Sequence, residues 1–289
     1  WRQAEHEGVQ KPTACTFWHA PRRSPPVICL NPARRDPACA TIMHIVVADL
    51  QEFYATPLGA VVRRRVMGRL QSRWRKPTRG VIIGLGYAVP YLGAFRNVAV
   101  RCGAFMPSRQ GALVWPREVF KQSVLIDEEQ LPLPDNSVDR MLVVHGLETA
   151  ERVQSMLRAM RRTLTHEGRL MVVVPNRRGI WARTDRTPFG FGRPYSRVQL
   201  EGMLKDAMFA PIEWSEALYV PPFSRDMLLR SAVAWERIGA RLMSGFAGVI
   251  IVEAAKELVA PISKPNKGAV LPELITVPNP AVRLATRQR

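Results

Sequence analysis

Short apolar runs alternate with amphipathic stretches through the middle of the chain. Five of the runs have the length of strands, and several end at a glycine, a proline or a polar residue, as strands that enter loops do. They are Val81–Gly84, Val98–Phe105, Ser123–Ile126, Met141–His145 and Leu170–Val174. The run at Met141–His145 has the nearly continuous apolar character of a strand that is buried on both faces.

Helices are predicted between and after these strands. Apolar residues at three- and four-residue spacing mark one of them, namely Val153, Met156, Leu157, Met160 and Leu164. Ser196 and Gln199 form a capping box, which predicts a helix that continues to about Ala207. The domain is completed by a strand at Trp214–Val220, a long helix near Asp226–Met243 and a strand at Gly248–Val252. Such repeated strand–helix units predict an α/β fold with a mainly parallel sheet, whose ligands bind at the carboxyl ends of the strands.

The two ends of the chain lack this pattern. Residues 1–42 are rich in proline and arginine without sustained periodicity, so we expect a disordered extension that cannot bury enough apolar area to fold. The regular pattern begins at Met43, which we take to lie near the functional beginning. Prolines also interrupt residues 263–289, where we expect a loose tail. The predicted organisation is therefore one folded domain over residues 43–262.

The net charge of +18 is the strongest compositional signal. A field of that sign attracts phosphates, acidic small molecules, anionic lipid or nucleic acid, although a solvated basic surface explains it equally well. The four cysteines form no C-x-x-C pair, so we expect neither a zinc site nor a disulfide framework, and no metal. No apolar run reaches the roughly 18 residues that a membrane span requires, and no signal peptide is apparent. We therefore expect a cytoplasmic protein without a membrane span. The oligomeric state cannot be read from these features.

A glycine turn follows the first predicted strand. Gly84 and Gly86 let the backbone approach a ligand closely, because neither carries a Cβ atom. The dinucleotide fingerprint G-x-G-x-x-G fails, since Val89 stands at its third glycine, and the chain contains no P-loop lysine motif. These features favour a smaller adenosine ligand.

The stretch Asp127–Asp139, which reads DEEQLPLPDNSVD, closely resembles a segment of class I S-adenosylmethionine (SAM)-dependent methyltransferases, especially their type 11 group. The sequence HGLE at His145 resembles the same family's motif at the end of the fourth strand, and LTHEGRL at Leu164 resembles its turn into the fifth strand. The resemblance covers roughly residues 78–208. It implies a Rossmann-like sheet of seven strands, mainly parallel, with helices on both faces and an antiparallel last strand.

The resemblance also implies a SAM site. Asp127 is expected to accept a hydrogen bond from the adenine amino group, with Glu128 alongside, and His145 is expected beneath the methionine moiety. The expected cofactor-binding residues are Gly84, Gly86, Tyr87, Phe105, Asp127, Glu128 and His145.

Two positions depart from the family pattern. Phe105 stands where an acid usually binds the ribose hydroxyls, and Ala88 replaces the third glycine of the first motif. Hydrogen bonds to a charged group are worth about 1.5–3 kcal/mol each, so their loss can weaken SAM binding by roughly 10-fold to more than 100-fold. A binding protein with this fold but without catalysis is therefore an alternative to an enzyme.

The methyl acceptor is not identified by any motif. Sequences typical of exocyclic-amine and cytosine-C5 methylation are absent, and His145 is the candidate for a general base, with a structural role as the alternative. Residues 176–195 interleave five arginines with four aromatic residues and are expected to lie over the carboxyl ends of the strands. Such a segment suits a small anionic or aromatic acceptor, RNA, or a purely structural lid. We prefer the small acceptor, with Arg177, Arg178, Trp181, Arg193 and Tyr195 as its expected binding residues.

Overall fold

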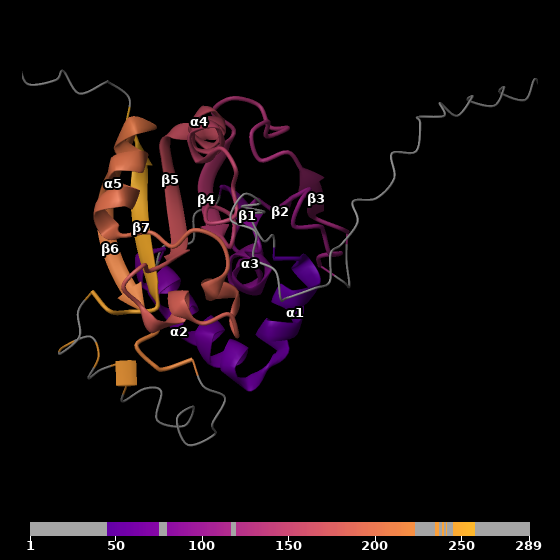
Figure 1. Cartoon of the computed structure of the whole chain (residues 1–289). Coiled ribbons are helices and arrows are strands. Elements are labelled where there is room, and N and C mark those ends of the chain that lie inside the picture. Colours follow the sequence, from indigo (N-terminus) through magenta and orange to yellow (C-terminus); the bar gives the residue numbers. More distant parts are fainter. Residues whose placement is uncertain are drawn as a thin grey trace, which may run out of the picture. The chain divides into compact units, whose positions relative to one another are not determined.

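A computed structural model of the chain describes residues 45–74, 80–116, 120–222, 235–236, 239, 241 and 245–257. The fold is built on one seven-stranded sheet in the order β3-β2-β1-β4-β5-β7-β6. Its strands are β1 (Val81–Gly86), β2 (Arg101–Pro107), β3 (Ser123–Ile126), β4 (Val138–Val144), β5 (Leu164–Pro175), β6 (Phe209–Ala217) and β7 (Val249–Lys256). Figure 1 shows the strands side by side across the molecule.

Pairing within the sheet is parallel from β3 through β5 and antiparallel at β7. Strand β1 lies between β2 and β4, with Gly84 opposite both Ala104 and Leu142. Strand β7 runs antiparallel to both β5 and β6. The predicted fold class, seven strands with an antiparallel last strand, is confirmed.

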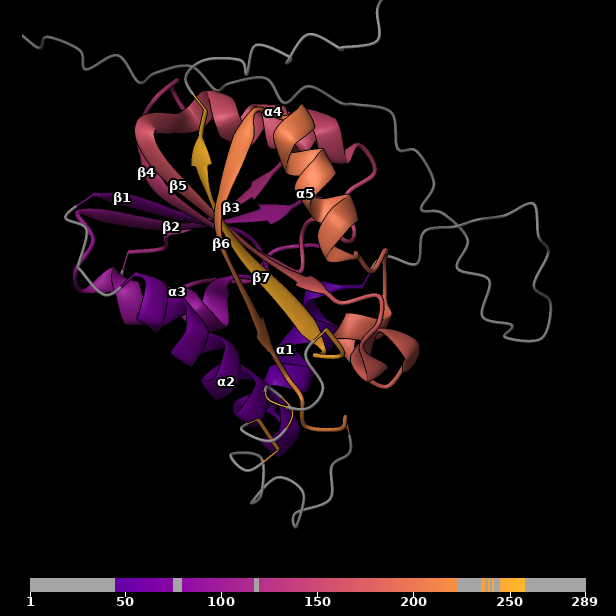
Figure 2. The same cartoon turned by 90° about the vertical axis from the view of Figure 1, so that its left-hand side faces the viewer.

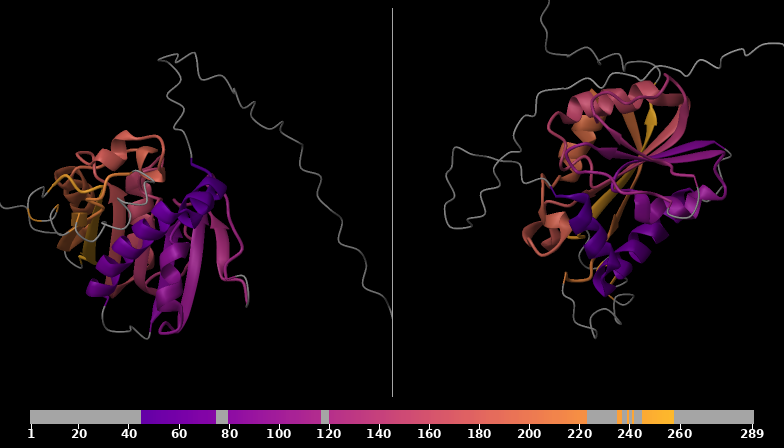
Figure 3. Two further views of the ribbon diagram at one scale, coloured as in Figure 1. Left: turned by 90° about the horizontal axis from the view of Figure 1, so that it is seen from below. Right: turned by 90° about the vertical axis from the view of Figure 1, so that its right-hand side faces the viewer.

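Helices cover both faces of the sheet, as Figure 2 shows. The helices are α1 (Val47–Ala55), α2 (Pro57–Arg73), α3 (Val89–Arg96), α4 (Val153–Thr163) and α5 (Arg197–Asp206), with 3₁₀ turns η1 (Ile180–Arg183) and η2 (Pro188–Gly190). Helices α2 and α3 pack on one face through Val62, Val66 and Leu92. Helices α4 and α5 pack on the other face through Met156 and Leu200. Two further views show α1 and α2 on the same side of the sheet as α3 (Figure 3).

Helices α1 and α2 were not among the elements predicted from the sequence. The start of α2 is nevertheless encoded in the chain, because the Thr56 hydroxyl accepts a hydrogen bond from the Gly59 amide at 3.0 Å and Pro57 occupies the first turn. Its buried residues recur every four positions, at Leu58, Val62, Val66 and Leu70. That repeat is a helical signal which the arginines between these positions obscure.

The element boundaries also differ from the predicted ones in places. Strand β2 begins at Arg101 rather than Val98, because Val98 and Val100 are exposed. Strand β6 lies at Phe209–Ala217 rather than Trp214–Val220. The capping box at Ser196 and Gln199 is confirmed, with both of its hydrogen bonds present.

Several predictions fall wholly or largely outside the described residues. They concern the extension at 1–42, the tail at 263–289 and the helix near Asp226–Met243. Among the described residues, no helix is long and apolar enough to cross a membrane. That same part of the chain contains no group of three metal-ligating side chains.

Candidate functional site

The parallel strands bring three of the expected site residues, Tyr87, Asp127 and His145, to one edge of the sheet, together with Asn176. Tyr87 follows β1, Asp127 follows β3, His145 follows β4 and Asn176 follows β5. The carboxyl ends of parallel strands form the usual ligand edge of this architecture. The sequence therefore places its candidate residues where the fold can bind a ligand.

The two glycines at the carboxyl end of β1 allow close packing. A Cβ atom on Gly84 would lie 2.6 Å from the Leu92 side chain, so this glycine lets α3 pack on the strand. Gly86 has φ +76°, and a Cβ atom there would lie 2.4 Å from the Val144 carbonyl oxygen. The Tyr87 amide donates to that same carbonyl at 2.7 Å. The turn is therefore fixed directly against the end of β4.

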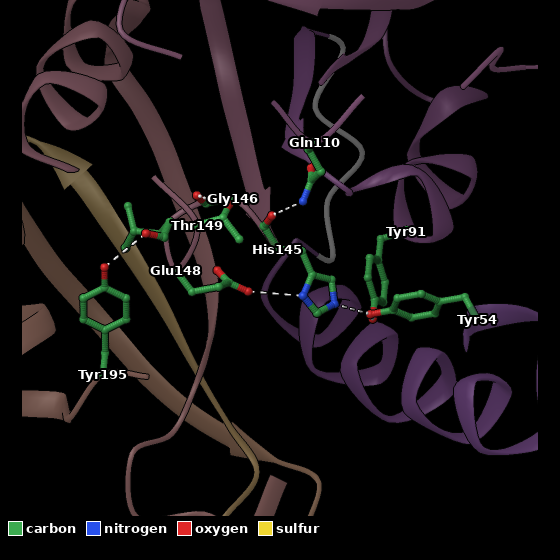
Figure 4. Close-up of polar contacts among 9 residues, drawn as sticks. Tyr54, Tyr91, Gln110, His145, Gly146, Glu148, Thr149 and Tyr195 are labelled. Carbon is green, nitrogen blue, oxygen red and sulfur yellow. Dashed lines mark hydrogen bonds and ion pairs between the residues drawn. The ribbon is translucent and has the colours of Figure 1, made fainter. Parts of the chain in front are cut away.

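A chain of buried polar side chains continues from the end of β4 (Figure 4). His145 Nδ1 lies 3.1 Å from Glu148 Oε1, and His145 Nε2 lies 3.0 Å from the Tyr54 hydroxyl. The Tyr54 hydroxyl in turn lies 3.0 Å from that of Tyr91. His145 is 1% exposed and Glu148 is 2% exposed, so water does not solvate either group. His145 also has φ +51°, an unusual value for a residue with a side chain.

Burial keeps the phenols of this region in their protonated form. It raises the pKa of Tyr54 well above its ordinary value, and the neighbouring Tyr91 raises the pKa of Tyr54 further. Burial also raises the pKa of Tyr87 to about 12 and that of Tyr91 higher still. The aromatic surroundings are dense, with the Phe189 ring 4.7 Å from that of His145. The network is therefore a neutral phenol pair joined to a histidine–carboxylate pair.

Two oxygens beside this network have no hydrogen-bond partner among the described residues. Gln110 donates from Nε2 to the His145 carbonyl at 2.7 Å, which leaves its Oε1 without a donor. The second is Glu148 Oε2. A buried acceptor without a partner costs about 1–3 kcal/mol. Both atoms are thus suited to a ligand that brings N–H donors or a positive charge.

The end of β3 carries a pair of acidic residues. Asp127 is exposed, and its Oδ1 accepts a hydrogen bond from the Glu129 amide at 2.9 Å. Burial raises the pKa of the Glu128 carboxyl, opposed by Arg109 and reinforced by the neighbouring acids. Asp127 is therefore an accessible carboxylate at the ligand edge, and its contact with adenine stays a prediction.

Phe105, unlike Asp127, has a buried side chain. Its side chain is 7% exposed and belongs to the core cluster that also contains Leu85, Ile126 and Leu147. Ala88 is also buried and lies against Gly84. No carboxylate therefore stands at the end of β2, and the ring contributes to the core.

The segment after β5 separates its aromatic residues from its arginines. Trp181, Phe189 and Tyr195 are buried, with Trp181 Nε1 donating to the Val220 carbonyl at 2.8 Å and the Tyr195 hydroxyl donating to the Leu147 carbonyl at 3.1 Å. The five arginine side chains are exposed and make no hydrogen bond or ion pair with other described residues: Arg177, Arg178, Arg183, Arg186 and Arg193. The aromatic side chains thus anchor the segment, and the cationic side chains face outward.

Arg177 and Arg193 line a groove of about 580 Å³ along α5. Its wall is fixed beside the ligand edge of the sheet, because the Arg193 amide donates to the Glu148 carbonyl at 2.9 Å and the Arg177 amide to the Tyr195 carbonyl at 2.9 Å. Val198 is 80% exposed and gives the groove an apolar surface. Of the expected acceptor residues, the structure brings Arg177, Arg193 and Tyr195 together here.

Comparison with known proteins finds a family that is similar to part of this chain. Residues 84–172 match the family described as a methyltransferase domain. The matched region includes the glycine turn, Asp127 and the His145–Glu148 turn. These residues are therefore similar to a methyltransferase domain.

Two solved structures share the fold of this chain. One is a SAM-dependent methyltransferase of Thermotoga maritima, described as a possible histamine N-methyltransferase, with 17% identity and a TM-score of 0.51; the match covers 73% of this chain and 96% of that one. The other is the partner of the Trm112 methyltransferase activator from Haloferax volcanii, with 16% identity and a TM-score of 0.53, covering 73% and 97%. No curated protein matches the chain.

The motifs did not reveal three residues of the polar network. Tyr54 on α1 bonds to His145, Tyr91 on α3 bonds to Tyr54, and Gln110 comes from the connection after β2. Tyr54 lies on a helix that was itself not predicted. Its position relative to His145 depends on tertiary packing across 91 residues of sequence, which local patterns do not encode.

Proposed function

We propose that this chain is a SAM-dependent methyltransferase, which transfers a methyl group from SAM to a small anionic acceptor that contains an aromatic ring. The exposed arginines of residues 177–193 carry this proposal, because they lie beside the ligand edge without carboxylate partners in the described part of the chain. A planar guanidinium binds a carboxylate or phosphate through two parallel hydrogen bonds. The apolar surface at Val198 suits the rest of such a molecule.

On the cofactor side, the free acceptors at Gln110 and Glu148 suit the ammonium group of SAM. Asp127 is our choice for the adenine amino group, with Glu128 beside it. Gly84, Gly86 and Tyr87 form the turn beneath the methionine moiety. Bound SAM supplies an electrophilic methyl group, and the protein's contribution is to bind and orient the acceptor.

RNA is the second candidate acceptor. Helix α2 carries five arginines and no acidic residue, and the net charge of the chain is +18. A basic helix of this kind can follow a phosphate backbone. Binding through phosphates would weaken steeply with salt, so a titration of RNA affinity against salt concentration separates this candidate from the small acceptor.

The test replaces Arg177, Arg178 and Arg193 by Gln in one variant. The probes are 4-hydroxybenzoate and its uncharged analogue 4-hydroxybenzamide, with radioactive methyl transfer as the measurement. We expect turnover of the carboxylate to fall about 10-fold or more per lost charged contact, because each such contact is worth about 1.5–3 kcal/mol. Turnover of the amide and affinity for S-adenosylhomocysteine (SAH) should stay within about threefold.

A matched control loses three exposed arginines elsewhere, at Arg64, Arg101 and Arg158. It carries the same change in net charge, so equal losses in both variants would indicate a general field effect. Weak SAH binding in the first variant alone would place the arginines in the cofactor site. Methylation of RNA but of neither phenol would replace the small acceptor by the second candidate.

A further inference from the structure

The two edge strands of the sheet differ in how open they are to another strand. The order of the strands places β3 at one edge and β6 at the other. Strand β6 contains Pro211, the acids Glu213 and Glu216, and a bulge between Pro211 and Glu213. Prolines, charged side chains and bulges keep a sheet edge from pairing with another strand. Strand β3, which reads SVLI, has none of these three features, so it is the edge that is open to pairing.

The backbone of β3 is paired on one side only. The Ala104 amide of β2 donates to the Gln122 carbonyl at 2.8 Å. The Ser108 amide, just after β2, donates to the Ile126 carbonyl at 2.9 Å. Backbone groups of alternate residues in a strand point to the same side, so those of Leu125 point away from β2. In the part of the chain that the structure describes, no strand lies on that side, and Figure 1 shows β3 at the end of the sheet.

Apolar side chains surround this open edge. Four large ones are exposed on β3 and on the connection that leads to it: Val114, Phe120, Val124 and Leu125. The connection is fixed against the strand, because the amide that follows Val114 donates to the hydroxyl at the start of β3 at 3.2 Å. Exposed apolar side chains that gather in one place mark an interaction surface. Together with the outward backbone groups, they suit a second strand with apolar side chains.

The charges before and after β3 have opposite signs. Lys121 precedes the strand, and Asp127, Glu128 and Glu129 follow it. When two copies of β3 pair antiparallel, the beginning of each strand lies beside the end of the other. With a twofold axis at Leu125, Lys121 of one copy lies opposite Glu129 of the second copy. Parallel pairing would set like charges side by side, so the charge pattern favours an antiparallel second copy as the partner.

We propose that the chain forms a symmetric dimer in which two copies of β3 pair antiparallel about a twofold axis at Leu125. The outward N–H of each Leu125 donates to the outward carbonyl of the other, and the two sheets become continuous. Both copies use the same surface, as a twofold interface requires. The apolar side chains of Val114, Phe120 and Val124 lose their exposure beside the axis. This dimer goes beyond the proposed methyl transfer and does not depend on it.

Sedimentation velocity of the full-length chain tests the dimer, in about 0.15 M salt to screen the repulsion between two copies of net charge +18. We expect reversible dimerisation with a dissociation constant of about 1–100 µM, because an interface built on one short strand is small. Leu125→Asp should raise that constant at least about 10-fold, because it sets two like charges directly opposite each other. A wild-type chain that is monomeric at about 300 µM, or a dimer that Leu125→Asp does not weaken, would overturn the proposal.

The matched control is Ile212→Asp on β6, the other edge strand. Ile212 is 50% exposed and Leu125 is 53% exposed, so the two substitutions add the same charge at similar positions. Ile212→Asp should dimerise as the wild-type chain does. An equal loss of dimer in both variants would mean that the added charge acts without regard to position, and the proposal would be wrong.

A mixing experiment tests the axis itself. Leu125→Asp and Leu125→Lys should each be monomeric at a concentration at which the wild-type chain dimerises. An equimolar mixture of the two should form mixed dimers, because opposite charges then face each other at the axis. A mixture that stays monomeric would overturn the axis at Leu125. Thermal scans check that the variants are folded; if Leu125→Asp is not, Phe120→Asp in the exposed connection replaces it, and an unchanged dissociation constant for that variant would overturn the proposal.

Discussion

Replacement of Phe105 tests the most unusual position of the site. The ring is 7% exposed and packs in a core cluster with Leu85, Ile126 and Leu147. Truncation of a buried Phe to Ala costs about 3–5 kcal/mol, because apolar contacts are lost and a cavity remains. A domain of this size loses about 2–4 °C of melting temperature per kcal/mol, so we expect Phe105→Ala to lower it by about 6–20 °C.

Urea unfolding followed by circular dichroism measures the free energy of unfolding, and a thermal scan measures the shift in melting temperature. Phe120→Ala is the control, because Phe120 is 89% exposed and its truncation should cost no more than about 0.5 kcal/mol. A loss below about 1 kcal/mol for Phe105→Ala would refute the core assignment. Phe105→Asp should destabilise the protein at least as much as Phe105→Ala does, and it should not tighten SAH binding. A stable Phe105→Asp with about tenfold tighter SAH binding would mean that the ring faces the ribose.

Two further predictions address the cofactor motif and the N-terminal region. Asp127→Ala should weaken SAM binding, measured by calorimetry, by about 1.5–3 kcal/mol. A thermal scan should show that the protein stays folded. Unchanged affinity would contradict the adenine assignment. Deletion of residues 1–42 should change the melting temperature by less than about 5 °C. Deletion through Ala55 should lower the melting temperature further, because it also removes the buried Leu50. Equal effects of the two deletions would contradict this prediction.

The sequence predicts the sheet well because buried parallel strands are short, apolar and bounded by turn residues. It also predicts the ends of strands where Asp127 and His145 stand, since those positions follow directly from the strand pattern. Helix α2 was missed because its apolar repeat at Leu58, Val62 and Val66 is interrupted by a run of arginines.

The parts of the site that could not be predicted depend on contacts between distant segments. Nothing near Tyr54 in the sequence indicates that its hydroxyl meets His145, or that Gln110 binds the His145 carbonyl. The burial of side chains in the segment after β5 could not be predicted from the sequence either. Its mixture of arginine and aromatic residues suggested one shared surface, yet packing places Trp181 and Tyr195 inside and leaves the arginines outside. Composition does not reveal which side chains a fold buries.

Calorimetry of the wild-type protein with SAH tests the central claim most directly. SAH shares the adenosine and amino-acid parts of the methyl donor, so it probes the cofactor site without any knowledge of the acceptor. We predict saturable binding of one SAH per chain with a dissociation constant below about 1 mM, which corresponds to about −4 kcal/mol. ATP, which contains the same adenosine but lacks the amino-acid part, should bind far more weakly. No saturable heat with SAH, or equal affinity for ATP, would contradict the account.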